Sequence, residues 1–237
     1  MFSVILPVHN EEYMLRRVFS TIINIDPDET IIILDRCIDN SEKVVLSFVN
    51  KYNLNVRFIR VDAKSSWKIH LNYLYNLGIS EASHDILLLT QADIALDSKI
   101  KDYIDLAKSH IIFLGYLMYL GWNTIASTLL FKLPIISRST GLIILRRDWA
   151  LKYNFIENLD LLYDTQIALK VRKFSIPSRF IMTRSWNLRP YVRSKLYDMG
   201  RTWYRLGKSL FRTSIVSLFR LQPEILVGYL QCKFRGD

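Results

Sequence analysis

The chain has 237 residues, of which 50% are hydrophobic and 23% are charged, and its formal net charge is +10. This length and apolar content allow one large domain with a full hydrophobic core, and they exclude an intrinsically disordered chain. The cysteines, Cys37 and Cys232, lie near opposite ends of the sequence without a C-x-x-C partner, which excludes a disulfide framework and a zinc or redox motif of that type. We therefore expect a reducing, cytoplasmic compartment.

Strands and helices alternate along the first half of the chain. Apolar runs rich in β-branched residues predict strands, and apolar residues at helical spacing predict the helices between them. In chain order we expect a strand over 3–6 that ends at Pro7, a helix over 12–23, a strand over 30–34, a helix over 41–51, a strand over 56–61, a helix over 65–77 and a strand over 85–90. This order predicts an α/β fold with a doubly wound, mostly parallel sheet.

Polar side chains follow each predicted strand. They are Asn10 and Glu11 after the first strand, Asp35 after the second, Asp62 after the third, and Gln91 and Asp93 after the fourth. Because ligands of such sheets bind beyond the carboxyl ends of the strands, we expect these side chains on one rim. Any one of them alone is more commonly a helix cap or a solvated loop residue. No glycine-rich phosphate loop follows the first strand, so a diphosphate held on this rim would need Mg²⁺ or Mn²⁺.

Four segments resemble motifs of the inverting family 2 glycosyltransferases of GT-A fold. The first is the opening strand with P-x-x-N-E from Pro7 to Glu11, and the second is the strand that ends at Asp35, with D-N-S after it. The third is the segment 88–94, where the family has D-x-D. The fourth combines the segments 141–147 and 164–172, which match an acceptor-side strand and the E-D helix. Their order and spacing are specific although each motif is weak alone. The resemblance implies a GT-A catalytic domain over 1–183, with a nucleotide-sugar-binding half (1–95) and an acceptor half (96–183), followed by C-terminal amphipathic helices over 184–237.

The resemblance also implies a role for each matched position. Asp93 would bind the Mn²⁺ or Mg²⁺ ion between the two phosphates, and Asp164 would be the general base. The remaining matched positions would lie against a UDP- or GDP-sugar donor: Pro7, Asn10, Glu11, Asp35, Lys68, Asn72, Gln91 and Ala92. Inverting transfer needs the same groups, because a leaving diphosphate needs charge stabilisation and the acceptor must lose a proton on the opposite face of the sugar. Without the other motifs, Asp164 would be interpreted as the N-cap of a helix over 165–172.

Two positions depart from the family pattern. Gln91 stands where the family has the first Asp of D-x-D, which implies an altered sugar or ribose contact and weaker metal binding. Tyr163, rather than an acidic residue, precedes Asp164. The Q-x-x-R-W motif of processive synthases is absent, which argues against polymer synthesis.

Residues 111–131 carry no charged side chain over a length that would suit a membrane span. A single span here would place Asp93 and Asp164 on opposite sides of a bilayer, although the resemblance needs both at one site. We therefore expect a buried strand over 111–118 and then an apolar helix, which belongs to the core or lines an acceptor groove.

The last part of the chain is basic, since Asp198 and Glu224 are the only acidic residues between Arg179 and Arg235. Apolar and aromatic residues recur at helical spacing between Tyr191 and Phe219, and we expect Pro223 to separate two helices. Such helices suit an anionic membrane interface, which would bring in a polyprenyl-phosphate or glycolipid acceptor and hold the protein peripherally on the inner face of the membrane. The alternative is that they pack on the catalytic domain.

Three other functions fit part of the sequence. Basic and aromatic residues in the tail also suit single-stranded nucleic acid, although nothing else resembles a nucleic-acid-binding module. A sugar-1-phosphate nucleotidyltransferase has a related sheet but opens with a basic, glycine-rich loop, which this chain lacks. The third is a degenerate transferase that binds a sugar nucleotide without turnover, which Gln91 would permit.

Overall fold

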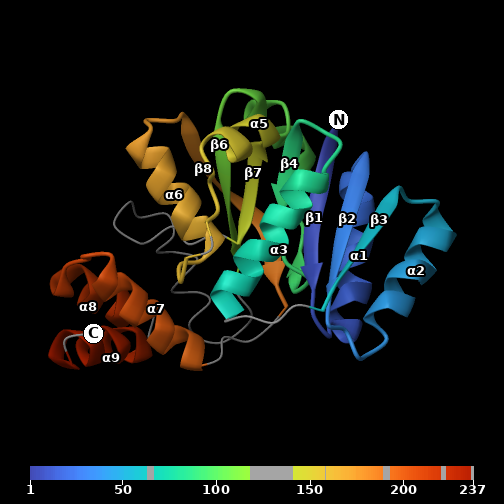
Figure 1. Ribbon diagram of the computed structural model, residues 1–237. Helices are drawn as coiled ribbons and strands as arrows, with labels where there is room; N and C mark the ends of the chain where they lie inside the picture. The colour runs from blue at the N-terminus through green and yellow to red at the C-terminus, as the bar shows by residue number, and fades with distance from the viewer. Residues whose placement is uncertain (63–66, 118–140, 158, 189–192, 220–222, 236–237) are drawn as a thin grey trace. The chain divides into compact units, whose positions relative to one another are not determined.

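The computed structural model describes residues 1–62, 67–117, 141–157, 159–188, 193–219 and 223–235 (Figure 1). The chain divides into two compact units. The first, which we call the sheet unit, comprises Met1–Tyr116 and Ser139–Leu188, and the second, the helical unit, comprises Leu117–Arg138 and Arg189–Asp237. Each unit is described separately below.

The sheet unit is built on an eight-stranded sheet with the order β3-β2-β1-β4-β7-β6-β8-β5. The strands are β1 (Phe2–Val8), β2 (Glu29–Asp35), β3 (Val56–Val61), β4 (Ile86–Leu89), β5 (Ile94–Ala95), β6 (Ile111–Leu117), β7 (Leu142–Arg146) and β8 (Ser178–Asn187). β1 runs parallel to β2 and β4, and β2 runs parallel to β3. β7 is antiparallel to both β4 and β6, so the sheet is mixed beyond its parallel half. The predicted α/β class is confirmed.

Helices cover both faces of this sheet (Figure 1). They are α1 (Glu12–Ile25), α2 (Ser41–Tyr52), α3 (Trp67–Glu81), α5 (Arg147–Lys152) and α6 (Tyr163–Lys173), with short 3₁₀ turns at Ser98–Tyr103 and Leu106–Lys108. α1 and α2 pack on one face and α3, α5 and α6 on the other, as the two buried clusters show. Alternate residues of one strand enter different clusters: Leu6 of β1 faces α1, and Ile5 faces α3.

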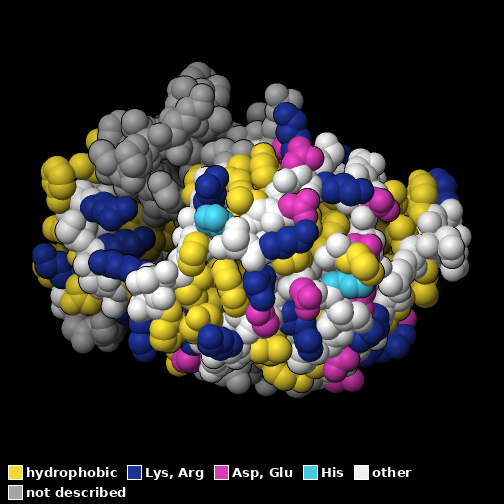
Figure 2. Space-filling model, turned by 90° about the horizontal axis from the view of Figure 1, so that it is seen from above, with side chains coloured by type: hydrophobic (Ala, Val, Ile, Leu, Met, Phe, Trp, Pro, Cys, Tyr) yellow, Lys and Arg dark blue, Asp and Glu magenta, His cyan; other side chains and the backbone are white. Residues whose placement is uncertain are grey.

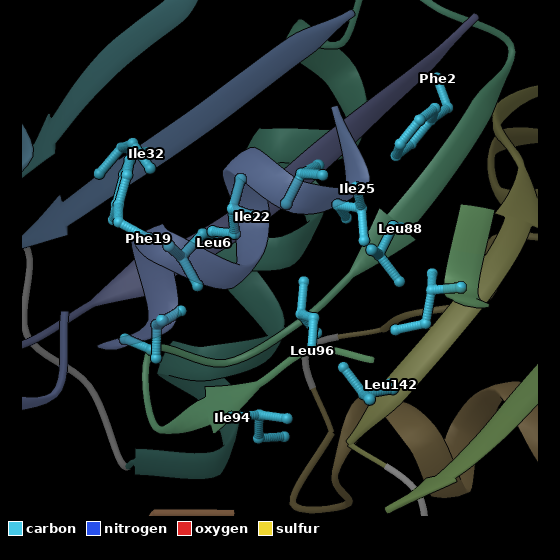
Figure 3. Packing of buried hydrophobic residues seen from close by; sticks show 14 of the residues in the cluster. Phe2, Leu6, Phe19, Ile22, Ile25, Ile32, Leu88, Ile94, Leu96 and Leu142 are labelled. Atoms are coloured by element: carbon cyan, nitrogen blue, oxygen red, sulfur yellow. The ribbon is translucent and has the colours of Figure 1, made fainter. Parts of the chain in front are cut away.

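The α1 side of the core shows why these segments fold as they do. Apolar residues of α1 recur at helical spacing and are all buried: Leu15, Val18, Phe19, Ile22 and Ile25. Phe19 and Ile22 lie near Leu6 of β1 and Ile32 of β2 (Figure 3). The helix ends at Asp26, which takes a left-handed conformation with φ 49°. The apolar stripe of α1 therefore packs against the buried side chains of β1 and β2, and this packing stabilises both the helix and the strands.

β1 extends further than the sequence predicted. The strand does not end at Pro7, because Pro7 pairs with Ile33 and the pairing continues at Val8. A proline lacks the backbone N–H of a central strand position, but the β1–β4 pairing stops at Ile5. Past that point β1 has a strand partner on one side only, so the missing donor is tolerated.

The uncharged stretch begins as predicted, with the strand β6 over Ile111–Leu117. The apolar helix expected after it falls outside the described residues. Within the part of the chain that the structure describes, no helix combines the length and the apolar character needed to cross a membrane.

The helical unit contains α7 (Arg193–Arg205), α8 (Leu210–Phe219) and α9 (Pro223–Arg235). α7 and α9 cross closely, because a Cβ on Gly200 would lie 1.9 Å from the Ile225 carbonyl oxygen and one on Gly228 would lie 2.1 Å from that of Tyr197. Trp203 packs there with Ile225 and Tyr229. Pro223 opens α9, as its missing N–H allows at a first helical position, and a further break at Gly207, with φ 65°, separates α7 from α8.

Candidate active site

The loops that follow β1 and β2 are tied to one another. Asn10 has a left-handed backbone with φ 53°, and its Oδ1 accepts a hydrogen bond from the Ile38 N–H at 2.8 Å. The Glu11 N–H donates to the Ser41 hydroxyl at 2.7 Å, and the Glu12 N–H donates to Asp39 at 3.0 Å. The structure thus joins the loop after β1, which carries Asn10 and Glu11, to the loop after β2, which carries Asp39 and Ser41.

Asp35 lies at the end of β2, 4% exposed, with partners on both carboxylate oxygens. Arg36 donates through Nε to Oδ1 at 2.6 Å and through a terminal nitrogen to Oδ2 at 2.8 Å. The His70 Nε2 lies 2.8 Å from Oδ1, and His9 lies 2.7 Å from the Asp35 carbonyl oxygen. Burial raises the pKa of Asp35, but hydrogen bonds and charges from Arg36 and His70 outweigh it and hold the pKa below its ordinary value. Asp35 therefore stays ionised inside the fold.

The segment after β4 carries Gln91, Ala92 and Asp93 in a tight turn. The Ile94 N–H donates to the Gln91 carbonyl at 3.1 Å, and the Leu188 N–H donates to the Asp93 carbonyl at 2.7 Å. Ala92 and Asp93 are buried, at 4% and 8% exposure. The Gln91 side chain donates from Nε2 to the Tyr163 hydroxyl at 3.1 Å. The turn that holds Asp93 is therefore bonded to the residue that precedes Asp164.

Three polar residues of α3, four residues apart along one helix face, hold the segment that leads into α6. The Lys68 Nζ lies 3.5 Å from an Asp160 carboxylate oxygen, and the Asn76 amide donates to the Ile156 carbonyl at 2.8 Å. The Asn72 amide, fully buried, donates to the carbonyls of Glu157, Leu159 and Leu161 at 3.3, 3.0 and 2.8 Å. The structure thus shows Asn72 bonded to this segment, where the resemblance had it facing the nucleotide.

Asp164 lies half-buried in the first turn of α6. The N-cap of this helix is Leu162, so the alternative that Asp164 is the cap is wrong. Its Oδ1 accepts a hydrogen bond from the Thr165 N–H at 2.7 Å. Negative charge in the first turn of a helix is stabilised by the helix dipole, which favours an ionised carboxylate here. From α6, the Gln166 Nε2 donates hydrogen bonds to the carbonyls of Glu157 and Leu161, which precede the helix, at 3.0 and 2.7 Å.

A divalent ion would find one buried carboxylate at the Asp93 turn. Among the described residues, no group of three or more His, Cys, Asp or Glu side chains gathers as a protein-only metal site. Mg²⁺ is commonly held by one or two carboxylates together with the phosphates of a substrate, so a single carboxylate fits an ion shared with a diphosphate. Asp93 is thus suited to a substrate-dependent metal site.

Some residues of this edge had no signal in the sequence motifs. His70 was not singled out, although it contacts Asp35. Gln166 was not singled out either, although it makes several of the bonds that shape the segment before α6. Long-range contacts of this kind depend on how helices cover the sheet, which local periodicity does not determine. A polar residue on an otherwise apolar helix face, such as His70 on α3, is the one hint that was present.

Comparison with known proteins identifies the family. Residues 3–113 match the family model described as glycosyl transferase family 2. These residues make up just under half of the chain, and over them the chain is similar to glycosyl transferase family 2. The family 2 match contains Glu11, Asp35, Gln91 and Asp93, whereas Asp164 lies beyond it. The chain is accordingly a glycosyltransferase, and its mixed sheet is the GT-A fold.

Solved structures of GT-A glycosyltransferases share this fold. The mannosyltransferase PcManGT from Pyrobaculum calidifontis, in complex with GDP-Man and Mn²⁺, has a TM-score of 0.68 at 12% identity and covers 100% of this chain and 76% of its own. S. aureus TarS 1-349 has a TM-score of 0.60 at 16% identity, covering 94% of this chain and 71% of its own, whereas a longer TarS structure is covered over only 43%. Glucosyl-3-phosphoglycerate synthase from Mycobacterium tuberculosis, in complex with Mn²⁺, UDP and phosphoglyceric acid, has a TM-score of 0.59 at 16% identity and covers 90% of this chain and 78% of its own. No curated protein matches this family 2 chain.

Proposed function

We propose that this chain transfers a sugar with inversion from a UDP- or GDP-sugar to an acceptor hydroxyl, with Mn²⁺ or Mg²⁺ at Asp93 and with Asp164 as general base. The observation that carries the proposal is the bond of 3.1 Å between Gln91 and Tyr163, which joins the Asp93 turn to the first turn of α6. A buried carboxylate for the leaving group and a half-buried carboxylate for the acceptor are thereby held on neighbouring elements. GDP-Man or UDP-Glc together with Mn²⁺ in structures of similar fold supports a nucleotide-sugar donor and a divalent ion.

In this mechanism each carboxylate has one task. A divalent ion, when bound, supplies positive charge that stabilises the leaving diphosphate. Asp164 accepts the proton of the acceptor as the acceptor oxygen bonds to the anomeric carbon, and the bond from that carbon to the diphosphate oxygen breaks. Attack on the face opposite the leaving group inverts the anomeric configuration. Pro7, Asn10, Glu11, Asp35, Lys68 and Ala92 are proposed to line or support the donor side.

Asp164→Asn tests the general base. The amide keeps the size of the side chain and its bond from the Thr165 N–H, but it cannot accept the acceptor's proton. We expect transfer to fall by roughly 10²–10⁴-fold. Donor affinity, measured by calorimetry with UDP-glucose and GDP-mannose, should stay within about twofold, because a change confined to the transition state leaves ground-state binding intact.

Asp148→Asn is the matched control, since Asp148 is also the acidic residue in the first turn of a helix, α5. It should retain wild-type transfer. If Asp164→Asn turns over at the wild-type rate, Asp164 serves the helix and another group removes the proton.

The helical unit supports a proposal about the acceptor. On α8 the usual burial of apolar and exposure of polar side chains is reversed. The polar Thr213 and Ser217 are buried, at 0% and 2% exposure, whereas the apolar Phe211 and Leu218 are exposed, at 77% and 72%. Phe211 and Leu218 are two turns apart and therefore share one face. An exposed apolar face of this kind marks an interaction surface.

The charge around α8 indicates which partner it meets. Arg205, Lys208 and Arg212 flank Phe211 along the chain, and no acidic residue occurs between Asp198 and Glu224. By contrast, acidic and basic side chains are interspersed over much of the face seen in Figure 2. Apolar side chains beside cations fit an anionic lipid surface, where each cation adds about 1 kcal/mol. We therefore propose peripheral attachment to the inner face of the membrane and a lipid-linked acceptor, a polyprenyl phosphate or glycolipid.

A further inference from the structure

The two positions at which this chain departs from its family's motifs touch each other. Gln91 replaces an acidic residue in the D-x-D segment, and Tyr163 replaces an acidic residue before Asp164. They are 72 residues apart in sequence, yet the Gln91 Nε2 donates to the Tyr163 hydroxyl oxygen at 3.1 Å. Neither substitution is therefore an isolated loss.

The Tyr163 hydroxyl joins two segments of the chain by hydrogen bonds. It accepts from Gln91 and donates to the Gly141 carbonyl, just before β7, at 2.7 Å. The ring is 1% exposed and packs on Tyr75 with ring centroids 4.1 Å apart. Burial, together with the neighbouring Tyr75 and Asp164, raises the pKa of Tyr163 well above its ordinary value, so the hydroxyl remains a neutral donor.

Gly141 leaves room for this arrangement. A Cβ at this position would lie 2.9 Å from the Gln91 Nε2, closer than real contacts allow, and 3.2 Å from its Cδ, which is tighter than most. The amide of Gln91 is therefore seated against a backbone without a side chain, with its nitrogen directed at Tyr163. The contact shows that the Gln91 side chain packs on the Gly141 backbone as well as bonding to Tyr163.

We infer that Gln91 and Tyr163 form a neutral positioning pair that holds the Asp93 turn against the first turn of α6, and that Gln91 is not a metal or ribose ligand. The Gln91 backbone shapes the Asp93 turn through its carbonyl, which accepts from the Ile94 N–H at 3.1 Å, while its side chain anchors that turn to α6. A carboxylate at position 91 would lack the donor that Tyr163 accepts, because the tyrosine proton is already given to Gly141.

Mn²⁺ binding separates this role from that of a ligand. The inference rests on the proposed function, since it assumes a metal site at Asp93. A ligand position predicts that Gln91→Glu tightens Mn²⁺ binding by adding a charge, whereas the positioning pair predicts that it weakens binding. We expect Gln91→Glu and Tyr163→Phe each to weaken Mn²⁺ binding by roughly five-fold, the effect of one ordinary hydrogen bond. Binding is measured by electron paramagnetic resonance of Mn²⁺ titrated into full-length protein with UDP or GDP.

The double variant tests the coupling. In Gln91→Glu/Tyr163→Phe the bond is already lost, so the two effects should combine to less than their product, with a coupling of about five-fold. Tyr229→Phe is the matched control, because it removes a buried tyrosine hydroxyl that donates to the Lys208 carbonyl at 2.7 Å in the helical unit. It should lower the thermal unfolding midpoint and leave Mn²⁺ binding unchanged.

Each result decides between specific accounts. Tighter binding in Gln91→Glu, or full additivity in the double variant, overturns the positioning pair. A lower unfolding midpoint in Tyr163→Phe with unchanged Mn²⁺ binding would show a purely structural contact and overturns it as well. Wild-type protein that binds no Mn²⁺ with either nucleotide overturns the proposed function itself, which distinguishes the two failures.

Discussion

Asp35 illustrates how single residues carry charge at the carboxyl edge of this sheet. Its carboxylate is nearly fully buried, a position that normally favours the neutral form. The bidentate contact of Arg36 and the contact of His70 reverse that preference, so the pKa is held below the ordinary value of 3.8. Arg36 achieves this from a left-handed backbone, with φ 46°, which places it next to its own neighbour's carboxylate.

Arg36→Ala should make the free energy of unfolding less dependent on the ionisation of Asp35. A carboxyl group whose pKa is lowered by folding contributes stability that is present above its unfolded pKa and lost as pH falls through its folded pKa. The variant should therefore be less stable than wild type at pH 6, where Asp35 is ionised in both the folded and the unfolded chain. The two stabilities should converge only as pH falls through the folded pKa of Asp35 in the wild type, which lies below the ordinary value of 3.8. His9 and His70 also face Asp35 in both proteins. The difference in the free energy of unfolding between wild type and variant is therefore followed from pH 6 downward.

Urea unfolding at a series of pH values gives this measurement. Arg60→Ala is the control, because Arg60 also pairs with a carboxylate, Glu42, but its side chain is 66% exposed. It should cost less than about 1 kcal/mol. An Arg36→Ala deficit that persists unchanged at the lowest pH would show that the loss comes from packing and not from the Asp35 charge.

At the scale of elements, the strands were the most predictable feature. Buried apolar runs gave β2 and β4, and the stripe of α1 gave its helix, because each pattern depends on neighbours in sequence. The positions of the carbonyls of residues 156, 157, 159 and 161 were not predictable, since Asn72 and Asn76 of α3 donate hydrogen bonds to them. The exposure of apolar side chains on α8 was not predictable either. Phe211 and Leu218 belong to an apolar pattern that predicts burial, and only the structure shows them exposed.

Leu218→Ser tests the lipid-facing role of α8. Removing an exposed leucine should weaken binding to anionic vesicles by roughly tenfold, because its transfer into an apolar layer contributes about 1.5–3 kcal/mol. Co-sedimentation of full-length protein with phosphatidylserine-containing and purely phosphatidylcholine vesicles measures the effect. Binding should prefer the anionic vesicles and weaken with salt.

Leu151→Ser is the matched control, since Leu151 of α5 is also an exposed leucine, at 53%, but lies in the sheet unit. Equal binding of both variants would remove α8 from the interface. Salt-dependent binding to single-stranded oligonucleotides without any binding to vesicles would favour the nucleic-acid alternative.

At the scale of the whole molecule, the sequence order predicted the parallel half of the sheet, and the site at its carboxyl edge stays a prediction. The antiparallel insertion of β7 between β4 and β6 was not predicted, because strand pairing across long connections has no local signature. That insertion matters for function. β7 follows Gly141, whose carbonyl accepts a hydrogen bond from the Tyr163 hydroxyl, and the same hydroxyl accepts one from Gln91 in the turn that carries Asp93.

The most direct test of the account is the thermal stability of wild-type protein with nucleotide sugar, with and without Mn²⁺, beside Asp93→Ala. A ligand at 100 times its dissociation constant stabilises the folded state by about 2.7 kcal/mol. The unfolding midpoint of a chain of this size should then rise by roughly 5–10 °C. We predict this rise for wild type with UDP- or GDP-sugar together with Mn²⁺, a much smaller one when EDTA replaces Mn²⁺, and none in Asp93→Ala. An equal rise in EDTA, or an undiminished rise in Asp93→Ala, would contradict a metal-dependent donor site at Asp93.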